Sequence, residues 1–189
     1  YITEEKYEAI SMAIEDFENV KKYIVVDPLS GGAGTSINMN INEVIANKAD
    51  LILNKPIGSY YTKPIEEVNL HQSTNDTFVT AGKITVIKKI RKLVEQIIAL
   101  QEEIQKKEKM YYNIKKISRT QLMDGVPILF GQTFAAWAEA LARDRWRLYK
   151  VEERIRSVNL GGTAVGNGFG APRDRKSTRL NSSHFVPSR

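Results

Sequence analysis

The sequence predicts an all-α fold, on three observations. No glycine or proline occurs between Gly82 and Gly125, so nothing in that stretch interrupts a helix. Apolar residues in two segments recur at the three- and four-residue spacing of one helix face. The 189 residues are 42% hydrophobic and 26% charged, a composition typical of a globular protein and not of a membrane-spanning or disordered chain.

The N-terminal region, residues 1–76, is expected to be helical. Its first element is an amphipathic helix over about residues 3–22, whose apolar face is formed by Tyr7, Ile10, Ile14, Phe17 and Val20. The next segment, residues 23–27, is short and β-branched and ends at Pro28.

A Gly-rich loop over residues 30–36 is predicted to precede the second helix. The pattern Asn40-x-x-Glu43 resembles a capping box, and we expect the helix to open there and to run to about Asn54. Residues 56–70 show little periodicity and are expected to form a loop.

Residues 77–172 are expected to form part of a central helical bundle. One long helix is predicted from about Lys83 to Lys116, with a stripe formed by Ile87, Ile90, Val94, Ile97 and Ile104. A second follows Gly131 and runs to Val158, and a short connection containing Pro127 makes the two antiparallel. Two helices alone leave both stripes uncovered, so further helices, from this chain or from partners, are implied.

The net charge of +6 is concentrated in residues 173–189. This tail holds five basic residues and one acid, which leaves +2 for residues 1–172. A surface so balanced does not indicate a nucleic-acid partner. The tail is aperiodic and rich in Arg, Ser and Asn, and we interpret it as non-native or disordered.

Cysteine and histidine content limits the possible chemistry. The absence of cysteine excludes a disulfide scaffold, a thiol nucleophile and Cys-ligated metal, and it fits a reducing compartment, so a cytoplasmic protein is expected. With His71 and His184 as the only histidines, no metal site is expected. His71 is expected to be structural or solvent-facing.

Small hydroxyl and amide residues gather at three points where we expect helices to begin, namely residues 35–38, 72–76 and 119–121. Free backbone N–H groups and the helix dipole favour an anion at such positions, and the side chains add directional donors. The alternative for each cluster is N-capping, for which Ser, Thr, Asn and Asp are the preferred residues.

Four ordered segments resemble the fumarase/aspartase superfamily of four-carbon-acid lyases, namely residues 32–47, 72–76, 119–127 and 159–166. The resemblance covers about residues 24–172 and is closest to the aspartate ammonia-lyases, which eliminate ammonia from L-aspartate to give fumarate. It implies no cofactor, and a homotetramer with a shared helix bundle in which three subunits assemble each active site. Residues 61–67 follow the superfamily pattern only loosely, which puts any secondary dicarboxylate site in doubt.

The resemblance also assigns substrate-binding residues, which are Thr35, Ser73, Thr74, Asn75, Thr120 and Gln121. Fumarases usually carry His at the position of Gln121, whereas some aspartases carry Gln, so this residue favours ammonia loss. The catalytic base of the superfamily is a Ser on a mobile Gly-Ser-Ser loop. That loop would lie beyond Pro172 and does not occur in the sequence, so the catalytic residue is unknown and the chain alone is expected to be inactive.

These residue types fit the chemistry of such an elimination. Removing the proton beside a carboxylate builds a second negative charge on it, which fixed hydroxyl and amide donors stabilise. Two alternatives remain open: a fumarase or another lyase of the superfamily, and a non-catalytic helical assembly module whose polar clusters are only caps.

Overall fold

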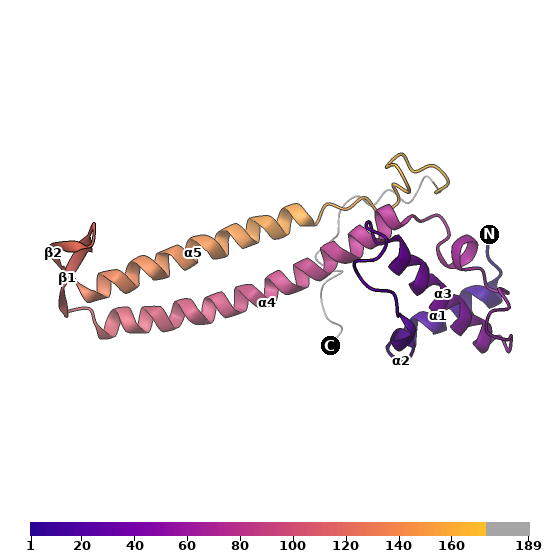
Figure 1. Cartoon of the computed structure of the whole chain (residues 1–189), viewed down its shortest axis with the longest axis horizontal. Coiled ribbons are helices and arrows are strands. Elements are labelled where there is room, and N and C mark those ends of the chain that lie inside the picture. Colours follow the sequence, from indigo (N-terminus) through magenta and orange to yellow (C-terminus); the bar gives the residue numbers. More distant parts are fainter. Residues whose placement is uncertain (173–189) are drawn as a thin grey trace. The chain divides into compact units, whose positions relative to one another are not determined.

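The computed structural model describes residues 1–172, which divide into two compact units. Unit 1 comprises residues 1–82 and 158–172, and unit 2 comprises residues 83–157. The predicted tail, residues 173–189, lies outside the described residues. Helices dominate both units (Figure 1), which confirms the predicted fold class apart from one small hairpin.

Unit 1 opens with three short helical elements where one helix was expected. They are α1 (Glu4–Glu15), α2 (Phe17–Val20) and the 3-10 helix η1 (Lys21–Tyr23). The break falls at Asp16, whose carboxylate accepts a hydrogen bond from Asn19 and lies 2.6 Å from Lys48 Nζ. These hydrogen bonds, the one from Lys48 first, lower the pKa of Asp16.

Helix α3 (Thr35–Ile52) begins five residues before the predicted start at Asn40. The capping-box interpretation is wrong because Asn40 lies inside the helix. Its Oδ1 accepts hydrogen bonds from Val25 N at 2.9 Å and Val26 N at 3.3 Å, and so holds the preceding segment against the helix.

The core of unit 1 lies between α1 and α3. The buried residues of this core are Ala9, Ile10, Ala13, Ile45 and Ala49, and Ile41, Ile52, Leu53 and Val68 pack against them. Small side chains on α1 allow the two helices to approach closely. The connection after α3, expected to be a loop, contains one π-helical turn, η2 (Pro64–Val68).

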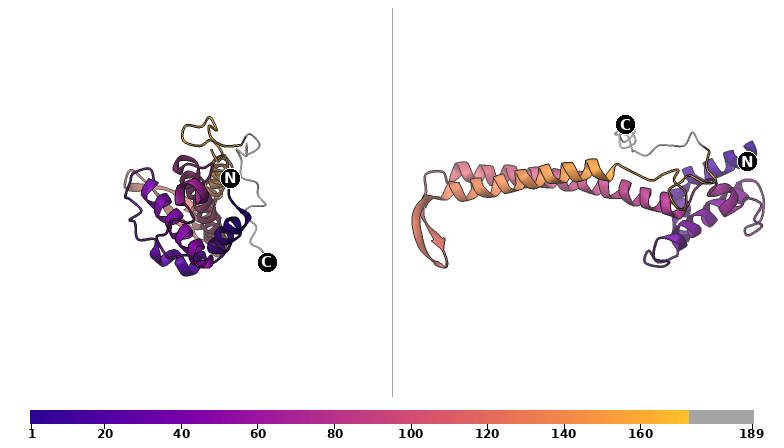
Figure 2. Two further views of the ribbon diagram at one scale, coloured as in Figure 1. Left: turned by 90° about the vertical axis from the view of Figure 1, so that its right-hand side faces the viewer. Right: turned by 90° about the horizontal axis from the view of Figure 1, so that it is seen from above.

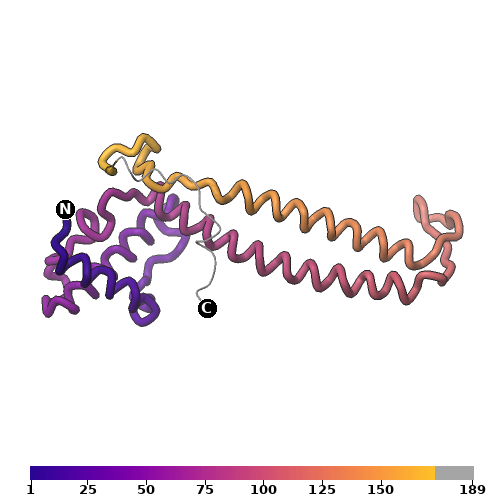
Figure 3. Tube along the Cα trace, turned by 180° about the vertical axis from the view of Figure 1, so that it is seen from behind, coloured from indigo at the N-terminus to yellow at the C-terminus, as the bar shows by residue number. Residues whose placement is uncertain are grey.

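Unit 2 is a pair of antiparallel helices closed by a β-hairpin. The pair consists of α4 (Thr74–Met110), whose first residues belong to unit 1, and α5 (Phe130–Ile155). Within unit 2 the two helices run side by side (Figures 1 and 3), and from above the two ribbons overlap along their length (right-hand view of Figure 2). The predicted stripe of α4 is covered at Ile87 and Ile90, which are buried, whereas apolar residues outside the predicted stripes are exposed, namely Leu93, Leu100, Trp146 and Tyr149.

The prediction of a helix to Lys116 and a short connection is wrong. Helix α4 ends at Met110, and β1 (Lys115–Thr120) pairs antiparallel with β2 (Met123–Leu129). Ser118 fixes a break in the register, because its Oγ accepts from Val126 N at 2.8 Å and donates to Val126 O at 2.7 Å. The cross-strand pairing places Lys115 and Lys116 in β1, although no glycine or proline breaks the predicted helix before them.

The base of the hairpin is closed by backbone and aromatic contacts. Phe130 N donates to Ile114 O at 2.7 Å and Gly131 N donates to Tyr111 O at 3.1 Å. Tyr111 stacks on Phe134, with ring centroids 5.7 Å apart. In residues 1–172 no helix is both long enough and apolar enough to cross a membrane.

Candidate active site

Thr35 is the first residue of α3 and is exposed to solvent. The N-cap is Gly34, at φ +86°, and no side chain caps the first turn. Gly34 is buried because Phe78 of α4 lies against it, and an added Cβ would come within 2.5 Å of the Phe78 ring atom Cε1. N-capping therefore does not explain the polar cluster at α3, and its first-turn N–H groups remain free of side-chain caps.

Ser73 caps helix α4. Its Oγ accepts a hydrogen bond from Asn75 N at 3.2 Å, and Asp76 Oδ1 accepts from Ser73 N at 3.0 Å, an arrangement that resembles a capping box but uses the second helical N–H and not the third. The capping interpretation is thus correct for Ser73. It does not extend to Thr74, whose hydroxyl makes no hydrogen bond within the described part of the chain.

The segment after α5 folds back onto the start of α4. Asn159 Nδ2 donates to Asn75 O at 2.6 Å, and Asn75 Nδ2 donates to Ala164 O at 2.8 Å. Asp76 Oδ2 accepts from Thr163 N at 3.0 Å. The structure therefore brings two of the four matched segments together, although more than 80 residues separate them.

Asn38 joins α3 to the same cluster. Its Nδ2 donates to Asn69 Oδ1 and its Oδ1 accepts from Thr77 Oγ1, both at 3.3 Å. The Thr77 hydroxyl also lies 2.9 Å from Ser73 O. The starts of α3 and α4 are in this way connected through side chains of residues next to the predicted site.

A pocket of about 470 Å³ opens in unit 1 beside these contacts. Its wall includes Gln72, Ser73 and the residues of the returning loop, Thr163, Ala164 and Val165. His71 also lines it: one ring nitrogen, Nδ1, lies 2.6 Å from Gly170 O, while the buried Nε2 has no hydrogen bond. Sequence reasoning missed Thr163 and Gln72 as wall residues, although both lie within matched segments.

Thr120 and Gln121 belong to unit 2 and lie on the hairpin. Thr120 ends β1 opposite Met123, and Gln121 forms a two-residue turn with Leu122. The prediction that this cluster precedes a helix is wrong. Both turn residues have positive φ, 49° and 64°, a conformation that costs a non-glycine residue ~1 kcal/mol or more. The six predicted site residues thus form two sets, one in each unit.

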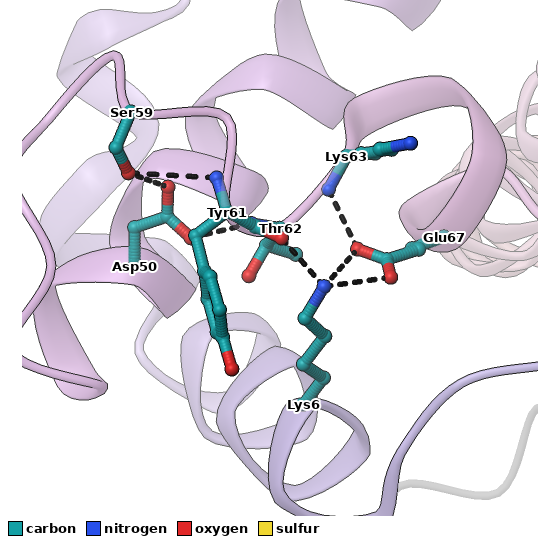
Figure 4. Close-up of polar contacts among 7 residues, drawn as sticks. All are labelled: Lys6, Asp50, Ser59, Tyr61, Thr62, Lys63 and Glu67. Carbon is teal, nitrogen blue, oxygen red and sulfur yellow. Dashed lines mark hydrogen bonds and ion pairs between the residues drawn. The ribbon is translucent and has the colours of Figure 1, made fainter.

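Residues 59–67 are held by two carboxylates (Figure 4). Buried Asp50 accepts hydrogen bonds from Thr62 N at 2.8 Å and Ser59 Oγ at 2.9 Å. Glu67 lies 2.8 Å from Lys6 Nζ and accepts from Lys63 N. These contacts tie the segment to α1 and α3, although the buried Thr62 hydroxyl has no hydrogen-bond partner within the described residues. Among residues 1–172 there is also no cluster of three or more His, Asp or Glu side chains arranged to hold a metal ion.

Two solved structures share the fold of this chain. Fumarate lyase:delta crystallin from Brucella melitensis, bound to cobalt, has 41% sequence identity and a TM-score of 0.82, over 91% of this chain and 38% of its own. Class II fumarase from Schistosoma mansoni has 28% identity and a TM-score of 0.82, over 91% and 37%. The fold of this chain is therefore that of the class to which fumarate lyases and fumarases belong.

Sequence comparison leads to the family. An aspartate ammonia-lyase of a Bacillus species is 45% identical over 148 residues, which are 78% of this chain and 32% of that protein. An aspartate ammonia-lyase of Escherichia coli K12 is 41% identical over 150 residues, or 79% and 31%. A family model described as lyase matches residues 1–184, and the chain belongs to this lyase family. It spans about a third of the length of these relatives.

Proposed function

We propose that the chain is part of an aspartate ammonia-lyase, which converts L-aspartate to fumarate and ammonia. The observation that carries the proposal is the start of α4, where Ser73 lines a pocket and Thr74 and Asn75 follow it in the same contiguous motif of hydroxyl and amide side chains. Neutral donors fixed before reaction stabilise the charge that develops on the substrate carboxylate. The similarity to aspartate ammonia-lyases over most of the chain supports the same conclusion.

The chain alone is proposed to be inactive, because the superfamily's Ser base has no counterpart in its sequence. A chimera supplies the missing part: residues 1–172 joined to the portion of the Bacillus subtilis aspartate ammonia-lyase that this chain does not cover. We expect the chimera to form fumarate from L-aspartate and the 189-residue chain to form none. A chimera that folds but forms no fumarate would favour the non-catalytic assembly module.

Fumarate hydration is the second candidate, supported by the likeness to the Schistosoma mansoni fumarase. Feeding L-malate and L-aspartate to the chimera in parallel separates the two activities. Gln121, in place of the usual His of fumarases, favours aspartate as the substrate.

Within the chimera, Thr74→Ala is expected to lower kcat/KM for aspartate by about 10²-fold, the usual cost of one stabilising donor. Thr3→Ala is the matched control, since Thr3 precedes α1 and its side chain makes no capping bond. Equal activities of the two variants would remove Thr74 from the site.

The same proposal includes a homotetramer with shared active sites, in which Thr120 and Gln121 of one copy join the Thr35 and Ser73 set of another. Two observations support it: the predicted residues fall into different units, and apolar surface on α4 and α5 is uncovered. Mixing the impaired Thr74→Ala and Gln121→Ala chimeras should raise the activity above that of either variant alone if sites are shared. No recovery after subunit exchange would place the whole site in one chain.

The cytoplasm is the proposed location, in accord with the absence of cysteine.

A further inference from the structure

Asp76 is a buried carboxylate whose partners lie at the two sides of the proposed site. Its side chain is 0% exposed, and it forms no ion pair within the described residues. One oxygen accepts from Ser73 N and the other from Thr163 N, each at 3.0 Å. A buried charge of this kind needs strong compensation, which these N–H groups and the positive end of the α4 dipole provide.

Both bonds of Asp76 act on groups that form the site. The bond to Ser73 N fixes the residue that opens α4 and lines the pocket. The bond to Thr163 N holds a β-branched residue at φ +56°, which is unfavourable for such a side chain. Because the neighbouring Ala164 O receives the Asn75 side-chain amide at 2.8 Å, the orientation of Asn75 also depends on this loop conformation.

We propose that Asp76 is a positioning residue that locks the Ser73–Asn75 turn and the Thr163–Ala164 loop into one rigid dicarboxylate-binding surface. The rigid contact between turn and loop follows from the hydrogen bonds of this chain, whereas a dicarboxylate as the ligand rests on the proposed function. Asp76 does not touch the ligand itself, since its side chain is fully buried. Its two oxygens must both be acceptors, because each faces a backbone N–H donor.

The test uses the 189-residue chain, with fumarate as the probe and backbone amide hydrogen exchange followed by NMR. Asp76→Asn keeps the size of the side chain but places a donor against one of the two N–H groups. We expect exchange of the Ser73 or Thr163 amide to accelerate and fumarate affinity to fall about ten-fold, as when a supporting residue of a site is lost. Asp76→Glu retains the charge but displaces it, and it should not restore affinity.

Asp50→Asn is the matched control, because Asp50 is equally buried and also accepts two hydrogen bonds, from residues that do not line the pocket. Its fumarate affinity should equal that of the wild type. Equal losses in the Asp50 and Asp76 variants, full affinity in Asp76→Glu, or a Thr163 amide that exchanges freely in the wild-type chain would each overturn the proposal.

The exchange measurement separates this proposal from the proposed function. If the wild-type chain binds no fumarate, the dicarboxylate site fails on this chain, yet the Thr163 amide still decides whether Asp76 locks the loop. Protection that is lost in Asp76→Asn and kept in Asp50→Asn supports the lock, and unchanged protection contradicts it.

Discussion

Arg91 on α4 donates hydrogen bonds to Glu152 on α5, with Nη2 2.9 Å and Nε 3.3 Å from Oε1. Arg156 Nη2 reaches the same oxygen at 2.8 Å. The Glu152 carboxylate is largely buried and joins the two helices of unit 2. Burial raises its pKa, but the hydrogen bonds from Arg91 and Arg156 outweigh this effect, so the pKa lies below the ordinary value of 4.5.

A lowered pKa predicts the sign of the pH dependence. The contribution of Glu152 is fully present above 4.5, its unfolded-state pKa, and is lost as the pH falls through the lower folded-state pKa. Glu152→Gln should therefore lower the thermal unfolding temperature at neutral pH, and the difference from wild type should shrink in acid. Glu139→Gln removes an exposed pair with Arg143 and should change little. A pH-independent difference for Glu152→Gln would contradict the assignment.

Gly34→Ala is expected to destabilise the chain by about 2 kcal/mol or more, because the added Cβ overlaps the Phe78 ring and the residue has positive φ. Gly82→Ala is the control, and its effect on the free energy of unfolding should have the opposite sign. Nothing lies within 4 Å of the Gly82 Cβ position, and alanine should stabilise helix α4 by ~1 kcal/mol. Denaturant unfolding measures both, and destabilisation in both variants would show that α4 is not helical at Gly82.

Leu122→Gly is expected to stabilise the hairpin by ~1 kcal/mol, since glycine adopts the positive φ of this turn without strain. The Leu122 side chain is fully exposed, so no packing is lost. Leu122→Ala keeps the strained conformation and should leave the unfolding free energy close to that of wild type. If alanine stabilises as much as glycine, side-chain exposure and not backbone strain is the cause.

Ser73→Ala should cost ~1 kcal/mol of stability, because it removes the N-cap of α4. Thr74→Ala should cost less, since the Thr74 hydroxyl makes no hydrogen bond in the described chain. Thermal unfolding of both variants under one set of conditions gives the comparison. A larger loss of stability for Thr74→Ala would show that Thr74 and not Ser73 caps α4. Thr74 would then have a structural role.

Local sequence patterns reach only the contiguous part of the proposed site. Ser73, Thr74 and Asn75 lie in one contiguous motif, and the spacing of Ser73 and Asp76 is that of a capping box. The contact of Asp76 with Thr163 spans 87 residues and carries no local signal. His71 lines the pocket together with residues of the distant returning loop, and this contact also carries no local signal.

The sequence by itself determined the helical class, the two long helices and the lyase family, because periodicity and contiguous motifs are properties of neighbouring residues. Tertiary structure alone decided where α3 begins, since Gly34 is placed by Phe78 and Asn40 by the backbone of residues 25 and 26. It also decided that residues 115–129 form a hairpin, because strand pairing satisfies the backbone between residues that are not neighbours in the chain. Long-range hydrogen bonds thus set the geometry that the local pattern leaves open.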